Sequence, residues 1–273
     1  MSRITFTKTG AVPDTDAVIV AEAVGTSVAV FAPAPPAPAP NSPLAFNDRD
    51  IGFSEIILPR LNIVQKVGNL SEVFSPGEIV LKQAFVIYTP PAKDGTGGTP
   101  PLNMTVVGFK KTQFAQKIAG GAMGILAHSE QEVVSHGGTL DYNEWKASEE
   151  AAKVTGGKPL TLFQRLATAL VLVEKPAHIA DEDHIEFPYE CEGKYYALLL
   201  WSMKGTAYTH AAKVCFTARF RGHLREGYSM QSWSLSTLME KFKDNYAAVP
   251  VIKPAAKNSE AFQAFVKDVL SCD

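Results

Sequence analysis

Residues 195–203 read Tyr-Tyr-Ala-Leu-Leu-Leu-Trp-Ser-Met, a run that is apolar or aromatic at almost every position. A short continuous apolar run without glycine or proline is typical of a strand that is buried on both faces. Three shorter runs earlier in the chain, 79–81, 84–88 and 104–109, also favour strands, and the Ser-Pro-Gly-Glu at 75–78 before them is turn chemistry. The sequence therefore predicts a domain built around short strands.

Two stretches mix the signals of helix and strand. In 160–173 the apolar residues follow a helical spacing while β-branched residues favour a strand, and we expect a strand over 169–173. Residues 233–242 are expected to begin as a strand and to enter a short helix.

Three segments favour helices. They are 143–154, 207–220 (wholly helical, or a helix followed by a strand) and 259–270, where Ser259 is a typical N-cap and the apolar residues recur at helical spacing. Many short strands with few long helices predict an α+β, β-rich domain folded as an antiparallel barrel with added helices. The C-terminal helix is expected to pack on this barrel through its apolar residues, with self-association as the alternative.

The N-terminal residues 1–47 have the composition of an arm. Alanine and proline alternate from Ala32 to Pro40, a pattern that favours an extended polyproline II chain because proline restricts both itself and the preceding residue. We therefore expect a flexible or extended arm over 1–47, followed by a single domain over 48–273. The alternative is a proline-rich ligand for a partner protein.

Composition limits the function classes. The chain has 273 residues, of which 46% are hydrophobic, and a net charge of −2. This is enough apolar material for a large core, and the charge excludes a wholly basic nucleic-acid coat, so an anion site must come from local segregation of charge. Three distant cysteines, the absence of a signal-peptide pattern and the absence of a membrane-length apolar run predict a soluble protein of a reducing compartment, without membrane contact.

Charge is segregated within the second half of the chain. Residues 174–192 hold seven acids and one lysine, whereas residues 194–225 hold six lysines and arginines and no acid. Aromatic residues lie between the cations, and cations with exposed aromatic faces are the two components of single-strand binding. The alternative is that Trp201, Phe216 and Phe220 are core residues beneath a solvated basic surface. A second basic and aromatic group, residues 109–117, follows a predicted strand and would extend such a groove.

Most patterns of enzyme chemistry are missing from the sequence. It holds no phosphate-binding GxxxxGK[ST], no GxGxxG after a strand, no GxSxG and no HExxH. The acidic cluster with Asp181, Asp183 and Glu186 leaves a metal-dependent nuclease as an alternative. We otherwise expect no catalytic residue, no metal and no cofactor.

The order of motifs resembles a group of tailed-bacteriophage proteins. The resemblance rests on Asp-Arg-Asp-Ile at 48–51, Leu-Pro-Arg-Leu-Asn-Ile-Val-Gln-Lys at 58–66, Ser-Pro-Gly-Glu-Ile at 75–79, Val-Val-Gly-Phe-Lys-Lys at 106–111 and the region 213–233. It covers roughly residues 48–250. It implies an OB-like barrel and a phage single-stranded-DNA-binding protein of the host cytoplasm.

Together these patterns predict a sequence-tolerant single-stranded-DNA-binding protein that acts in replication or recombination. Further partners would be replication or recombination proteins and a second copy of the chain. The residues expected to neutralise phosphates are Lys204, Lys213, Arg219, Arg221 and Arg225. Those expected to stack on bases are Trp201, Tyr208 and Phe216, and those expected to flank the groove are Lys110, Lys111 and Lys117. The alternatives are a virion or assembly protein and the metal-dependent nuclease.

Overall fold

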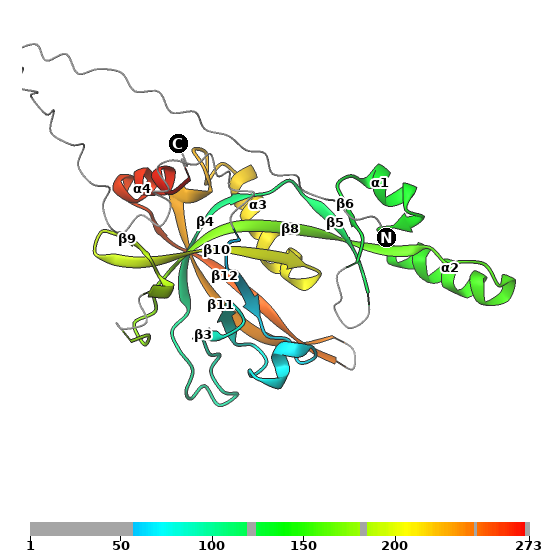
Figure 1. Cartoon of the computed structure of the whole chain (residues 1–273), viewed down its shortest axis with the longest axis horizontal. Helices are drawn as coiled ribbons and strands as arrows, with labels where there is room; N and C mark the ends of the chain where they lie inside the picture. Colours follow the sequence, from blue (N-terminus) through cyan, green and yellow to red (C-terminus); the bar gives the residue numbers. More distant parts are fainter. Residues whose placement is uncertain (1–56, 119–123, 181–184, 243–244, 271–273) are drawn as a thin grey trace, which may run out of the picture. The chain divides into compact units, whose positions relative to one another are not determined.

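The computed structural model of the chain describes residues 57–118, 124–180, 185–242 and 245–270 (Figure 1). They belong to one compact unit, which spans Pro38–Asp273. The expected arm, residues 1–47, lies outside the described residues.

Twelve strands form one sheet whose main path runs β12-β11-β4-β8-β10-β1-β2-β3. Their bounds are β1 (Arg60–Ile63), β2 (Ile79–Leu81), β3 (Phe85–Tyr88), β4 (Leu102–Phe109), β5 (Gln113–Gln116), β6 (Leu126–Ala127), β7 (Gly138–Thr139), β8 (Thr161–Glu174), β9 (Tyr189–Cys191), β10 (Lys194–Lys204), β11 (Gln231–Phe242) and β12 (Asn245–Lys257).

Few helices accompany this sheet. They are α1 (Glu130–Ser135), α2 (Tyr142–Thr155), α3 (Lys213–Phe220) and α4 (Glu260–Leu270), with 3-10 turns η1 (Asn69–Glu72) and η5 (Tyr228–Met230) and a π-helical segment, η4 (Tyr208–Ala212), that runs directly into α3. Of the helices in the described part of the chain, none is long and apolar enough to span a membrane.

The sheet is mixed and curled into a half-barrel (Figure 1). The prediction of a β-rich α+β domain is confirmed at this level. The expectation of a wholly antiparallel sheet is wrong, because β1 runs parallel to β10 and β7 runs parallel to β8.

The long strands β8 and β10 form the centre of the sheet and define its two faces. They pair antiparallel from Tyr196 opposite Glu174 to Lys204 opposite Leu166. Since side chains alternate along a strand, Trp201 and its neighbours two residues away point to one face and Leu200 to the other. We call these the inner and the outer face.

The inner face carries the main core, and the segment η4–α3 packs against it. Ala211, Ala212 and Cys215 are buried in the same cluster as the inner-face residues of β8 and β10. Small side chains on this side of the helix allow it to approach the sheet closely.

The outer face is covered at one end by α4. Phe262 and Val266 of this helix are buried against Leu172, Tyr196 and Leu198 of the sheet. The side chain of Ser259 accepts a hydrogen bond from the amide of Phe262 at 3.0 Å, which is the expected N-cap. Packing of the C-terminal helix on the sheet is confirmed.

Three long strands differ from the sequence predictions, and the short strands β5, β6, β7 and β9 were not predicted. All of Thr161–Glu174 is strand, because β8 has partners on both edges that bury the apolar residues of both faces. No helix follows Trp233, because β11 pairs with β12 as far as Phe242. The strand β12 was not predicted because it contains prolines, which the outermost strand of a sheet tolerates.

Candidate nucleic-acid interface

Two of the three aromatic residues expected to stack on bases lie in the core. The side chain of Trp201 is 3% exposed and that of Tyr208 is 9% exposed. Trp201 points to the inner face of β10, and Tyr208, at the start of η4, belongs to the same hydrophobic cluster. Their rings are covered by the fold, so a base has no access to them. The third, Phe216, is half-buried and contacts Phe109 edge-on, with a ring-centroid distance of 4.7 Å.

The exposed aromatic residue of the basic segment is Phe220, which is 92% exposed at the end of α3. The helical period explains this exposure, because positions 213, 217 and 220 lie on one stripe of the helix while Ala212 and Cys215 face the sheet. Lys213 and Thr217, the other residues of this stripe, are also exposed. In the sequence, Phe220 stands among the cations and is named only as a candidate core residue. Its helical phase relative to the small buried residues was the signal that identifies it.

Arg219 is held in place beside Phe220. Its guanidinium lies over the ring of Tyr228, 5.8 Å from the centroid, and its Nη1 donates a hydrogen bond to the carbonyl of Leu224. Burial raises the pKa of the Tyr228 hydroxyl, so the ring stays neutral beneath this cation at physiological pH. Arg219 therefore both closes the turn after α3 and contributes charge to the surface.

The turn after α3 presents two more arginines. The amide of Gly222 donates to the carbonyl of Arg219 at 3.1 Å, and Gly222 has φ +80°, a conformation that favours glycine. A Cβ at Gly222 would lie 3.2 Å from Nε of Arg225, which shows that the Arg225 side chain folds back over this turn. Arg221 and Arg225 are both exposed.

The expected flanking pair Lys110 and Lys111 lies next to this helix. Phe109, which precedes them at the end of β4, contacts Phe216 of α3 and also Tyr228, at a centroid distance of 5.0 Å. The amide of Lys110 then donates to the carbonyl of Thr168 in β8 at 2.8 Å. The two basic groups of the sequence are thus joined through one aromatic cluster. We call Arg219, Phe220, Arg221 and Arg225, with the exposed Lys111 two residues after Phe109, the basic corner. Lys110 lies opposite Thr168 and by strand alternation points to the outer face, as Lys204 does.

The structure does not bring Lys204 and Lys117 into this corner. Lys204 ends β10 opposite Leu166 and points to the outer face, whereas α3 covers the inner face. The amide of Lys117 donates a hydrogen bond to the carbonyl of Leu162. Leu162 lies four residues from Leu166 along β8, a distance of about 13 Å. These two lysines therefore belong to the opposite side of the sheet.

The cations of the basic corner have no carboxylate partners among the described residues. Elsewhere in this part of the chain, Lys82, Arg165 and Lys194 form ion pairs with Glu186, Glu130 and Glu174 at 2.6, 3.0 and 2.9 Å. A cation without a neighbouring acid keeps its full attraction for a phosphate, apart from screening by salt. Apart from the exposed Glu226, which follows Arg225, the basic corner is therefore a positive surface, and it includes the exposed ring of Phe220.

Residues of the expected nuclease site do not form a metal centre in the described part of the chain. Asp181 and Asp183 lie outside the described residues, and the carboxylate of Glu186 is paired with Lys82. No group of three or more His, Cys, Asp or Glu residues able to hold a metal occurs among the residues that are described. Burial raises the pKa of the Cys215 thiol to about 12, so this cysteine is a packing residue and not a nucleophile at neutral pH.

Comparisons of the chain with protein-family models, with curated proteins and with solved structures found no match.

Proposed function

We propose that this chain is a non-enzymatic protein that binds single-stranded DNA without sequence preference, with the basic corner as its contact surface. In this proposal the half-barrel is OB-like, and the protein serves DNA replication or recombination of a tailed bacteriophage in the host cytoplasm.

The observation that carries the proposal is Phe220, a fully exposed aromatic ring between two arginines. A ring exposed to water does not contribute the free energy that burial of its apolar surface would give. A ligand that covers the ring gains this free energy on binding. A nucleobase is one such ligand, because every base has a π-face, and stacking contributes about 1–3 kcal/mol per base. The arginines would contact the phosphates on either side of the stacked base.

The expected binding has two separable parts. Arg221, Arg225 and Lys111 would release counterions from the strand, so affinity should fall as salt rises. Phe220 would supply a salt-independent part. Neither part reads the edge of a base, which is why we expect tolerance of sequence.

The proposal is tested by fluorescence-anisotropy titration of a labelled poly-dT oligonucleotide, at low and moderate salt and with duplex DNA as competitor. Tight, salt-sensitive binding that duplex does not compete supports it. Phe220→Ala should weaken this binding, whereas Val154→Ala should not. Val154 is a matched control because it is 87% exposed and follows a lysine in the last turn of α2.

A second candidate function is an assembly protein, in which the basic corner contacts an acidic partner subunit. Exposed apolar side chains on one face of the β11–β12 hairpin favour it, because Leu238 is 60% and Phe242 37% exposed. Clustered exposed apolar residues mark protein interfaces. Stable oligomers without DNA, together with no binding of poly-dT at low salt, would select this function instead.

A further inference from the structure

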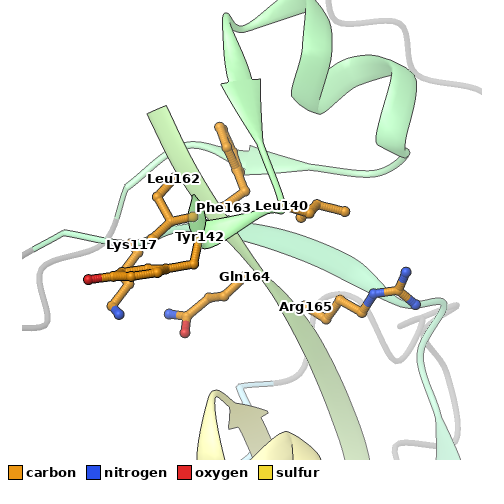
Figure 2. Close-up of a pocket in the computed structure, with 7 residues that line it drawn as sticks. All are labelled: Lys117, Leu140, Tyr142, Leu162, Phe163, Gln164 and Arg165. Carbon is orange, nitrogen blue, oxygen red and sulfur yellow. The ribbon is translucent and has the colours of Figure 1, made fainter. Parts of the chain in front are cut away.

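A second candidate site lies away from the basic corner, between β8 and the start of α2. A depression of about 310 Å³ opens there, with Leu140 and Leu162 among its lining residues. This volume is at the lower end of the range found for small-molecule sites. Figure 2 shows the residues that line it.

Strand geometry places two polar side chains of the depression on the same face. The amide of Lys117 bonds to the carbonyl of Leu162 at 2.8 Å, and Gln164 follows two residues later on the same side of β8. Lys117 and Gln164 extend to one side in Figure 2, whereas Phe163 points to the other side and packs in a separate small core. Arg165 also extends away, and its guanidinium is paired with Glu130 at 3.0 Å.

Tyr142 contributes an aromatic wall that the start of α2 holds in place. The side chain of Asp141 accepts hydrogen bonds from the amides of Asn143 and Glu144 at 2.7 and 3.3 Å. The hydroxyl of Thr139 accepts one from the amide of Asp141 at 3.0 Å. These bonds fix the direction in which Tyr142 leaves the helix. They also occupy amides of the first turn, so an anion in the depression would be held by Lys117 and not by the helix terminus.

The three side chains have unused binding capacity within the described part of the chain. Lys117 is exposed and forms no ion pair there, and no hydrogen bond joins the amide of Gln164 to another described residue. Tyr142 is 51% exposed, and its ring contacts that of Trp145 at a centroid distance of 5.4 Å. An ammonium group, an amide with a donor and an acceptor, and an aromatic ring therefore line one depression.

We propose that this depression binds one nucleoside phosphate unit. The base lies on the ring of Tyr142, the amide of Gln164 hydrogen-bonds its edge, and Lys117 contacts the phosphate. This inference rests on the proposed function, since it names a second contact for the same class of ligand. The unit has two sources, a free mononucleotide or the terminal nucleotide of a bound strand.

The test uses the full chain and calorimetric titration with thymidine 5′-monophosphate, with thymidine, and with poly-dT oligonucleotides with and without a 5′-phosphate. Tyr142→Ala should weaken binding of the monophosphate about tenfold, and Tyr142→Phe should retain it, because the ring and not the hydroxyl does the stacking. Lys117→Gln should remove the preference for the monophosphate over thymidine. Lys153→Gln, an exposed lysine in the last turn of α2, is the matched charge control.

The outcomes separate this inference from the proposed function. Binding of poly-dT without any binding of the monophosphate, and without preference for the 5′-phosphate, overturns the nucleotide pocket and leaves the basic corner intact. Binding of the monophosphate without binding of poly-dT supports the nucleotide pocket and overturns the basic corner as a DNA-binding surface. It also identifies a free mononucleotide as the ligand. Tighter binding of the phosphorylated oligonucleotide end than of the monophosphate, lost in Tyr142→Ala, supports the pocket with a strand terminus as its ligand.

Discussion

The helices α3 and α4 pack on opposite faces of the same sheet, and they place their aromatic residues differently. In α4, Phe262 is 4% exposed and lies against Tyr196 at a centroid distance of 5.1 Å. In α3, small residues and the half-buried Phe216 face the core, while Phe220 at the end of the helix is 92% exposed. Helix α4 buries Phe262 against the sheet, whereas α3 leaves Phe220 in water beside arginines.

This difference separates residues that stabilise the fold from residues that are free to bind. Burial of a phenylalanine side chain contributes roughly 1.5–3 kcal/mol to folding, so Phe262 is explained by stability alone. Phe220 contributes little to folding in its observed position. Its presence between Arg219 and Arg221 is therefore better explained by a ligand than by the core.

The largest expected effect comes from Phe262→Ala. It should lower the free energy of unfolding by about 3 kcal/mol, because it leaves a cavity between α4 and Tyr196. Phe220→Ala should change the same quantity by less than about 0.5 kcal/mol. Urea unfolding of both variants measures these two changes. Equal losses of unfolding free energy would mean that Phe220 stabilises the fold as much as Phe262 does.

Next in size is the loss of DNA binding in Phe220→Ala. We expect affinity for poly-dT to fall by about 1–3 kcal/mol while the slope of affinity against salt stays the same, because the ring carries no charge. Trp201→Phe serves as the comparison, since a conservative change of a buried ring should leave binding by the folded protein unaltered. A steeper or shallower salt slope in Phe220→Ala would contradict the stacking role.

A smaller effect concerns the buried side of α3 and its dependence on pH. Burial raises the pKa of Cys215 from 9.0 to about 12, so between these values the folded state keeps a proton that the unfolded state releases. The contribution of this thiol to stability is fully present below pH 9 and is lost as pH rises toward 12. Between pH 8 and pH 10 the wild-type chain should lose about 1 kcal/mol more than Cys215→Ala. Urea unfolding at both pH values measures this difference, and parallel losses would show that Cys215 is accessible to water.

The smallest expected effect is that of Arg221→Gln. Removal of one phosphate contact should weaken binding a few-fold at moderate salt and reduce the salt slope by about 0.7, the share of one contact on a single strand. Lys146→Gln removes the same charge from α2 and should leave the slope unchanged. If both variants reduce the slope equally, binding depends on net charge and not on the basic corner.

Much of the fold follows from local sequence. The helix at the C-terminus could be predicted from Ser259 and the apolar spacing after it, and α2 was predicted within two residues at each end. The strand β8 could not be predicted fully, because its apolar residues also fit a helix and its partners β4 and β10 lie far away in the sequence. Tertiary pairing decided between the two structures.

The candidate site was less accessible to sequence analysis. The charge asymmetry identified the correct segment, but the ring at Trp201 lies within the same apolar run that predicted a buried strand. The identity of the exposed ring depended on the phase of α3, which only the packing of η4 against the sheet fixes. The end of β4 lies beside α3 through the contact between Phe109 and Phe216, and local patterns carry no information about such a contact.

The π-helical segment η4 has a consequence for how the basic corner tolerates changes in chain length. A π-turn holds one residue more than an α-turn, and each residue turns an α-helix by about 100°. Deletion of one residue within Tyr208–Ala212 would therefore convert this segment to an α-turn without rotating α3, whereas deletion of one residue within α3 would rotate Phe220 by about 100°. The segment η4 can therefore absorb a change of one residue in chain length while the exposed direction of Phe220 is kept, and α3 itself cannot.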